Sequence, residues 1–217
     1  LSVYNYADCP ANATTGTTMG TGGAPMGGGC ATSDFDVWYN FYSGSNTTAF
    51  VDLTGDHVAG IEVSAACGAG SFYCSLGLHH ELSVLPDATY HVRVFSGSFD
   101  DLGEFGICVS QPVANDECAN AQYIGGAQTY GTCSATTSTT LGSTPSGGSC
   151  ASTDDDVWFY FSSSTGSASF VDLTAITASG LSIEVFEATC GGTSVYCGSG
   201  LSHTVPTTAG QTYYMRV

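Results

Sequence analysis

The sequence predicts an all-β protein made of two tandem, disulfide-linked β-sandwich domains of the jelly-roll or immunoglobulin-like kind. The first supporting observation is a repeat. Residues 36–41 return as residues 156–161, both beginning Asp-Val-Trp, at a shift of 120 positions (156 − 36). Residues 50–54 return unchanged as residues 170–174 at the same shift. A fixed period of this size indicates a structural module repeated in tandem.

The second observation is the pattern of short strands between turns. In residues 90–94 and 157–161, apolar side chains alternate with other side chains along the chain. Residues 170–173 and 183–186 are short runs rich in β-branched and aromatic residues. Clusters of Gly, Ser and Thr separate these runs, and no segment has a sustained helical period with caps. We therefore expect roughly six to nine strands in each complete unit, as in known sandwiches.

The phase of the repeat predicts where the units meet. We expect one sandwich over residues 1–112 and a second over residues 113–217. The segment 115–124 has no counterpart in the first half, and the segment 95–109 has none in the second. The first unit is therefore expected to lack its first strand, and the second its last strands. Either the sequence comes from a longer array, or neighbouring chains supply the missing strands.

Composition excludes several classes of partner. Of 217 residues, 42% are apolar, which is enough for a core, and the formal net charge is −17 with only two Lys or Arg residues. Nucleic acid and anionic lipid are disfavoured as partners, because both need a cationic surface. No apolar run approaches the roughly 20 residues of a membrane span, so direct membrane insertion is not expected. Divalent cations are the natural electrostatic partners of such a chain.

Ten cysteines at repeated spacings indicate an oxidising compartment and an extracellular or cell-surface location. Spacing alone predicts the disulfides Cys67–Cys74, Cys190–Cys197, Cys9–Cys30 and Cys133–Cys150. Cys108 and Cys118 either pair with each other across the junction or each bond a missing partner of their own module. Each bridge would contribute about 2–4 kcal/mol. Zinc is disfavoured, because no Cys-x2-Cys occurs.

The two arginines occupy the same repeat position, Arg93 and Arg216 (216 − 93 = 123), each on an expected strand. Opposite charges across a sheet stabilise strand pairing, and a guanidinium can bind a carboxylate in two-pronged geometry. We expect structural ion pairs of these arginines. Two sets of partners fit the sequence, namely Asp36 with Asp156, or Glu62 with Glu184.

Other side chains are weaker candidates for a site. Asp154, Asp155 and Asp156 are candidate calcium ligands, because Ca²⁺ prefers six to eight oxygens, although the first unit has lost the middle carboxylate of this run. Trp38 and Trp158 are candidates for stacking on a glycan, although a Trp at such a place is more often core or interface. No nucleophile stands in a recognisable catalytic setting.

Five motifs together resemble a known kind of repeat: residues 115–121, 155–159, 190–192, 212–217 and 103–109. They are similar to the secreted β-sandwich modules of cell-surface proteins of Bacteroidetes-type bacteria. Those modules include relatives of pre-peptidase C-terminal domains and cargo of type IX secretion. The resemblance covers nearly the whole chain, and it implies display, adhesion or attachment to a secreted enzyme rather than catalysis.

These observations predict a non-enzymatic structural or adhesive repeat protein of an extracellular appendage or filament. Assembly would occur through β-strand edges or strand complementation, with a homo-polymer or neighbouring repeat modules as partners. The alternative is a carbohydrate-binding module of a larger secreted enzyme or adhesin, with surface glycans as partners. No cofactor is required under either hypothesis, and calcium is the one candidate ion.

Overall fold

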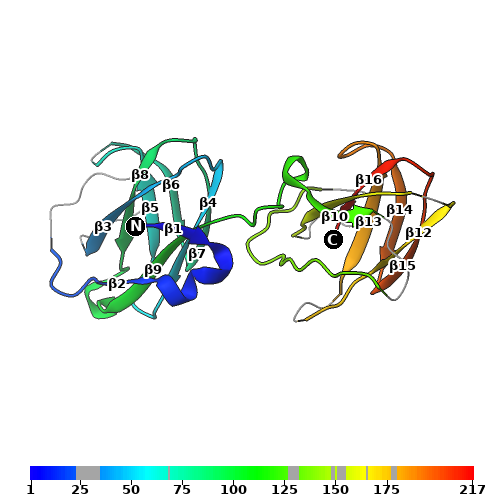
Figure 1. The fold of residues 1–217 in the computed structure, drawn as a ribbon. Coiled ribbons are helices and arrows are strands. Elements are labelled where there is room, and N and C mark those ends of the chain that lie inside the picture. The colour runs from blue at the N-terminus through cyan, green and yellow to red at the C-terminus, as the bar shows by residue number, and fades with distance from the viewer. Residues whose placement is uncertain are drawn as a thin grey trace. The chain divides into compact units, whose positions relative to one another are not determined.

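The computed structural model describes residues 1–22, 35–67, 69–126, 132–147, 150, 155–164, 166–176 and 180–217. The chain forms two compact units, Leu1–Pro112 and Val113–Val217 (Figure 1). The predicted all-β, disulfide-linked sandwich class is confirmed, since the described elements are strands and short 3₁₀ helices. Within the same residues, no helix is long and apolar enough to cross a membrane.

The first unit contains two sheets. One sheet has the order β1 (Val3–Asn5), β9 (Glu104–Gln111), β4 (Thr48–Thr54) and β7 (His79–Ser83), with β2 (Thr14–Thr17) also paired to β9. The other has the order β3 (Asp36–Tyr42), β8 (Thr89–Phe95), β5 (Gly60–Ser64) and β6 (Ser71–Leu76). The short 3₁₀ helices η1 (Tyr6–Asp8), η2 (Pro10–Asn12) and η3 (Phe99–Asp101) lie in the connections.

The second unit also contains two sheets. The larger has the order β10 (Gln122–Gly126), β11 (Trp158–Ser162), β16 (Thr212–Arg216), β13 (Ser182–Glu187) and β14 (Ser194–Ser199). The smaller pairs β12 (Ala168–Asp172) with β15 (Ser202–Pro206). The 3₁₀ helix η4 (Cys118–Asn120) precedes β10.

The strand orders of the two units match except at two places. The order β3-β8-β5-β6 recurs as β11-β16-β13-β14, and the pair β4-β7 recurs as β12-β15. In the second unit, β10 lies parallel to β11, whereas the described part of the first unit has no such strand beside β3. In the first unit, β9 lies between β1 and β4, whereas β12 has only β15 beside it among the described strands.

The core of each unit is made by alternate residues of its strands. Successive side chains of a strand point to opposite faces, so every second residue meets the facing sheet. The core of the first unit includes Val51, Leu53, Val92, Val94, Phe105, Ile107 and Val109. The core of the second unit includes Val157, Phe159, Val171, Ile183, Val185, Val205 and Met215.

The equivalent strands β4 and β12 differ in how their outer faces are covered. Phe50 of β4 is 3% exposed, whereas its counterpart Phe170 of β12 is 67% exposed. Phe50 stacks on His79 at a ring-centroid distance of 5.6 Å and meets Tyr6 edge-on at 5.5 Å. Because Tyr6 belongs to η1, the N-terminal segment is what buries Phe50. Residues 50–54 and 170–174 are identical, so the surroundings of the phenylalanine decide its burial.

Truncation of these two phenylalanines should therefore have unequal effects. Phe50→Ala removes a buried ring and should lower the free energy of unfolding by about 3 kcal/mol. Phe170→Ala removes a largely exposed ring and should cost less than about 1 kcal/mol. Urea unfolding of both variants and of the unsubstituted chain checks this expectation. Equal losses would contradict the described difference in cover.

Candidate functional site

The strongest cluster of functional side chains is a row across the larger sheet of the second unit. Arg216 lies on the middle strand β16, in register with Trp158 of β11 and with Glu184 of β13. Cys197 of β14 is in register with Glu184 and extends the row. Residues directly opposite each other on paired strands share one face of the sheet. Because the alternate residues of these strands form the core, the row lies on the outer face.

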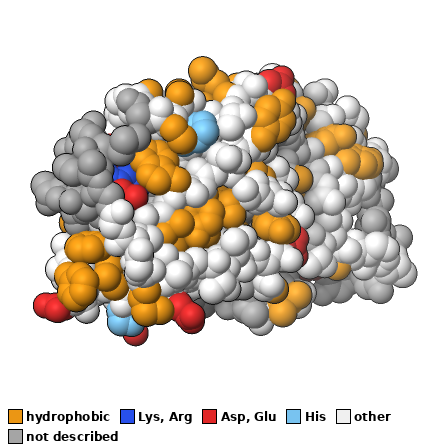
Figure 2. Space-filling view, turned by 90° about the vertical axis from the view of Figure 1, so that its left-hand side faces the viewer, with side chains coloured by type: hydrophobic (Ala, Val, Ile, Leu, Met, Phe, Trp, Pro, Cys, Tyr) orange, Lys and Arg blue, Asp and Glu red, His pale blue; other side chains and the backbone are white. Residues whose placement is uncertain are grey.

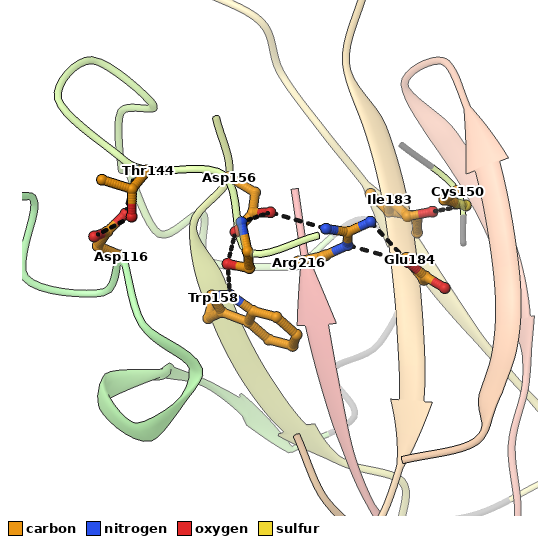
Figure 3. Close-up of polar contacts among 9 residues, drawn as sticks. Asp116, Thr144, Cys150, Asp156, Trp158, Ile183, Glu184 and Arg216 are labelled. Atoms are coloured by element: carbon orange, nitrogen blue, oxygen red, sulfur yellow. Dashed lines mark hydrogen bonds and ion pairs between the residues drawn. The ribbon is translucent and has the colours of Figure 1, made fainter. Parts of the chain in front are cut away.

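Arg216 is held between two carboxylates. Its Nη2 lies 2.9 Å from Glu184 Oε2, and its Nη1 lies 2.9 Å from Asp156 Oδ2 (Figure 3). Its Nε also donates to Glu184 Oε2, at 3.1 Å. All three residues are at most 4% exposed. One buried positive charge thus lies between two buried negative charges, and it stabilises the cluster only while every partner remains.

A segment that precedes β11 covers this outer face. Ser146 donates from its backbone N and from its Oγ to the two oxygens of Asp156, at 3.2 and 2.5 Å. The indole Nε1 of Trp158 donates to Ser146 Oγ at 3.0 Å. The disulfide Cys150–Cys197 links the same segment to β14. The segment is therefore attached to both ends of the row, and it excludes water from the arginine.

The first unit repeats the arrangement. Arg93 of β8 is 1% exposed and lies in register with Trp38 and Glu62. Its Nη1 donates to Glu62 Oε2 at 3.1 Å, and its Nε donates to Asp36. The sequence left two sets of partners open for the arginines. In the structure each arginine contacts one residue from each set, because the Asp lies at or just before the start of one neighbouring strand and the Glu lies on the other.

Asn115 and Asp116 make structural hydrogen bonds that the sequence analysis did not predict. Asp116 accepts hydrogen bonds from the backbone N and the Oγ1 of Thr144, at 2.6 and 3.0 Å (Figure 3). Burial raises the pKa of Asp116, and the two bonds from Thr144 oppose that rise. Asn115 Nδ2 donates to the carbonyl of Trp158 at 3.0 Å. The only feature of the sequence that could have predicted these contacts is that both residues belong to the motif 115–121.

The candidate calcium ligands do not form a cation site in the described part of the chain. Asp154 lies outside the described residues, and Asp155 is exposed. Both oxygens of Asp156 are already used by Ser146 and Arg216. No group of three or more His, Cys, Asp or Glu side chains is arranged for a metal among the described residues. Asp156 thus binds the guanidinium of Arg216 and the backbone N and Oγ of Ser146.

Trp158, which the sequence offered as a candidate for glycan stacking but more often as a core side chain, is buried. Trp158 is 4% exposed. Its ring stacks on the ring of Phe186, with the two ring centroids 5.5 Å apart. Its polar edge is occupied by Ser146. Trp38 is half-buried in the first unit. The cover over the outer face, which spacing along the sequence does not reveal, removes Trp158 from solvent.

The disulfide pairs predicted from spacing are wrong. The structure contains Cys9–Cys108, Cys118–Cys190 and Cys150–Cys197. Cys67 and Cys133 are free and exposed, Cys74 is disulfide-bonded, and Cys30 lies outside the described residues. Cys108 and Cys118 do not pair with each other, since each bonds a cysteine of its own unit.

The predicted pair Cys190–Cys197 does not form because the two cysteines lie at different places on the sheet and meet different segments. Cys197 lies on the outer face of β14, where the covering segment brings Cys150 to it, whereas Cys190 lies in the turn before β14 and meets Cys118 of η4. Closeness along the sequence therefore does not bring Cys190 and Cys197 together.

Each unit also contains a buried histidine with both ring nitrogens bonded. His80 is 1% exposed, its Nε2 lies 2.9 Å from the Gly77 carbonyl, and its Nδ1 lies 3.4 Å from the Tyr73 hydroxyl. A neutral ring that donates from Nε2 and accepts at Nδ1 satisfies both contacts. The second unit repeats this arrangement with His203, Gly200 and Tyr196. His80 and His203 occupy equivalent repeat positions (203 − 80 = 123), and their shared hydrogen bonds give both a structural role.

Comparison with known proteins gives one result for the second unit. Residues 114–217 match a family model described as galactose binding domain-like, associated with type IX secretion. No curated protein matches the chain. The second unit is thus similar to a non-catalytic, galactose-binding-like β-sandwich. The match supports a secreted or cell-surface protein of the Bacteroidetes type.

Removal of the buried cation should unfold the second unit readily. Arg216→Met leaves Glu184 and Asp156 buried without their partner, and should cost about 3–5 kcal/mol. The triple variant Arg216→Met, Asp156→Asn, Glu184→Gln should recover part of this loss, because no uncompensated charge remains. Urea unfolding measures each variant. Asp155→Asn, at an exposed neighbour, serves as the control and should change little.

Acid should destabilise the first unit through His80. Burial lowers the pKa of His80 below its ordinary value of 6.5, so the unfolded chain takes up a proton before the folded one does. The resulting stability is complete above about pH 6.5 and falls as the pH drops below it. His80→Gln can keep both hydrogen bonds and should flatten this dependence. The free energies of unfolding of the unsubstituted chain and of His80→Gln are measured at pH 7.5 and pH 5. Equal losses of stability in the two proteins would contradict the role of His80.

Proposed function

We propose that this chain is a non-catalytic extracellular module with a structural or adhesive function, which assembles with neighbouring repeats through its β edges. The observation that supports this function best is that β12 is an edge strand among the described strands. In the first unit, β4 has β7 on one side and β9 on the other. Among the described strands, the equivalent β12 has only β15. Unpaired backbone groups on a strand edge favour addition of another strand.

Incomplete cover of the core beside β12 supports the same function. Val51 and Leu53 of β4 are 0% and 3% exposed, because β9 and its side chains close the core beside them. Their counterparts are less protected, since Val171 is 9% exposed and Leu173 is only half-buried. An added strand would gain backbone hydrogen bonds and bury apolar surface at the same place.

The charge of the chain favours specific over non-specific association. Both arginines are buried, and the formal net charge is −17, so the charged groups at the surface are mostly acidic. Copies of the chain repel one another at long range, which disfavours unspecific contact. On the face drawn in Figure 2, apolar and uncharged side chains predominate over charged ones. Close contact would therefore depend on strand pairing and apolar burial.

The assembly proposal predicts self-association that depends on the edge of β12. Light scattering across a concentration series, with electron microscopy, should show oligomers or filaments of the full chain. Phe170→Lys places a charge on the open edge strand and should abolish them, because edge lysines block strand addition. Ile176→Lys is the matched control, since Ile176 is 80% exposed and lies outside β12. A chain that stays monomeric at every concentration, or variants that behave alike, would refute this function.

Carbohydrate binding is a second candidate, favoured by the galactose-binding-like description of the matching family. A row of tyrosines on the outer face of the larger sheet supports it. Tyr123 of β10 lies opposite Tyr160 of β11, which lies opposite Tyr214 of β16. The neighbouring ring centroids are 4.9 and 5.8 Å apart, and Tyr123 is 50% exposed. Aromatic faces of this kind suit the apolar faces of sugar rings.

Glycan binding should therefore depend on the tyrosine row and not on Trp158. Glycan arrays with the full chain should show a bound sugar, and Tyr123→Ala should weaken that binding about tenfold by removing a stacking surface. Tyr42→Ala, at an exposed tyrosine of the first unit, is the control and should leave binding unchanged. Silence on the array, or equal loss with the control, would count against this candidate.

A further inference from the structure

Three rows of side chains lie next to one another on the outer face of the larger sheet of the second unit. The row of Arg216 lies beneath the covering segment. The next row is the tyrosine row, made of Tyr123, Tyr160 and Tyr214. Beyond it, Ser162 lies opposite Thr212. Side chains two positions apart on a strand share a face, so the tyrosine row lies between a covered row and a row of small hydroxyl side chains.

The rings of the tyrosine row lean against one another. The ring centroids of Tyr123 and Tyr160 are 4.9 Å apart with the ring planes at 39°, and those of Tyr160 and Tyr214 are 5.8 Å apart at 28°. Rings this close and this nearly parallel cannot lie flat on the sheet side by side, because their edge atoms would overlap. They therefore stand upright and present their edges and hydroxyls outward. Tyr123, at the end of the row and 50% exposed, keeps one ring face for stacking.

The hydroxyls of this face have no hydrogen-bond partner within the described part of the chain. This holds for the phenol oxygens of the tyrosine row and for the side chains of Ser162 and Thr212. Among the described residues, the buried side-chain polar atom without a partner is Ser110 Oγ, in the first unit. The hydroxyls beside and within the tyrosine row therefore reach solvent, and each can both donate and accept a hydrogen bond.

The same face is uncharged. The chain has 19 Asp and Glu residues, yet neither the tyrosine row nor the pair of Ser162 and Thr212 includes a carboxylate. The carboxylates that bind Arg216 are buried in the covered row. An uncharged ligand with many hydroxyls fits this surface. An acidic ligand would be repelled by the net charge of −17.

The first unit shows that the sheet does not need these tyrosines in order to form. Asn40 and His91 occupy the places of Tyr160 and Tyr214 (160 − 40 = 120 and 214 − 91 = 123). They lie opposite each other on β3 and β8, in a sheet with the matching strand order. The tyrosine row is therefore a property of the surface of the second unit and not a requirement of the fold.

We infer that the tyrosine row binds an extended, uncharged glycan of three or more sugar units, which lies across β10, β11 and β16. The inference rests on the carbohydrate-binding function proposed above and names its class of ligand. The distance between neighbouring rings is close to the length of one sugar unit in an extended glycan, so each phenol hydroxyl would meet one unit. Ser162 and Thr212 would bind one edge of the glycan, and the covering segment would lie along the other.

The dependence of binding on glycan length and charge tests the inference. Linear oligomers of glucose, galactose, mannose and xylose, from one to six units, are titrated into the full chain by calorimetry. Galacturonate oligomers serve as the acidic series. The trimer of the bound sugar should bind at least about tenfold more tightly than the monomer, because its units share one loss of translational freedom. Equal affinities for monomer and trimer, or tightest binding of the acidic series, would overturn the inference.

The loss of single hydroxyls tests the mode of contact. Tyr160→Phe and Tyr214→Phe keep the ring contacts and should each weaken binding of the trimer about threefold to tenfold. Tyr42→Phe, which removes a hydroxyl of the first unit that is bonded to Asp87, is the matched control and should change nothing. Unchanged binding by both Tyr160→Phe and Tyr214→Phe would show that the hydroxyls do not contact the glycan.

A double variant replaces the row by the residues of the first unit. Tyr160→Asn with Tyr214→His should abolish the gain in affinity from monomer to trimer, while urea unfolding confirms that the variant is folded. Failure of every glycan to bind the unsubstituted chain would refute carbohydrate binding and this inference together. Binding that depends neither on glycan length nor on these tyrosines would overturn this inference alone, since the sugar would then bind elsewhere on the chain.

Discussion

A guanidinium buried between two carboxylates ties together one sheet of each unit, β3-β8-β5-β6 in the first and β10-β11-β16-β13-β14 in the second. Arg216 reaches Glu184 on one neighbouring strand and Asp156, which precedes the other, so three strands depend on one charge. The same holds for Arg93 in the first unit. Since these are the only two Lys or Arg residues in 217, both cations of the chain are used inside it. Such a cluster tolerates no single loss, because each removal leaves a buried charge without its partner.

The cover over the outer face follows from this constraint. A charged row on the outside of a sheet would ordinarily be solvated, but a segment bonded to Asp156 and Trp158 through Ser146 closes over it. The disulfide Cys150–Cys197 fixes that segment to the far strand. The second unit therefore has two buried layers, one between its sheets and one beneath the cover. This arrangement removes Trp158 from any binding surface and leaves the neighbouring tyrosines as the accessible aromatic row.

The two units have matching strand orders, β3-β8-β5-β6 in the first and β11-β16-β13-β14 in the second. The first shows how a strand of the β9 type closes the core and how its cysteine anchors the segment that covers Phe50. The second shows how a strand of the β10 type adds to the larger sheet, with Cys118 just before it. Cys67 of the first unit and Cys133 of the second are free and exposed.

The sequence by itself determined the all-β class, the repeat and the pairing of arginine with acidic residues, because alternation, period and charge are local or composition-based properties. It did not determine which cysteines meet, and every bridge predicted from short spacing that the structure tests was wrong. A disulfide depends on which face of a sheet a side chain occupies and on which segment crosses that face. The burial of Trp158 and the exposure of Phe170 were decided in the same way, since equivalent side chains pack differently when their neighbours differ. Only the tertiary structure brings such distant segments together, and it therefore decided the covered row and the disulfide pairs.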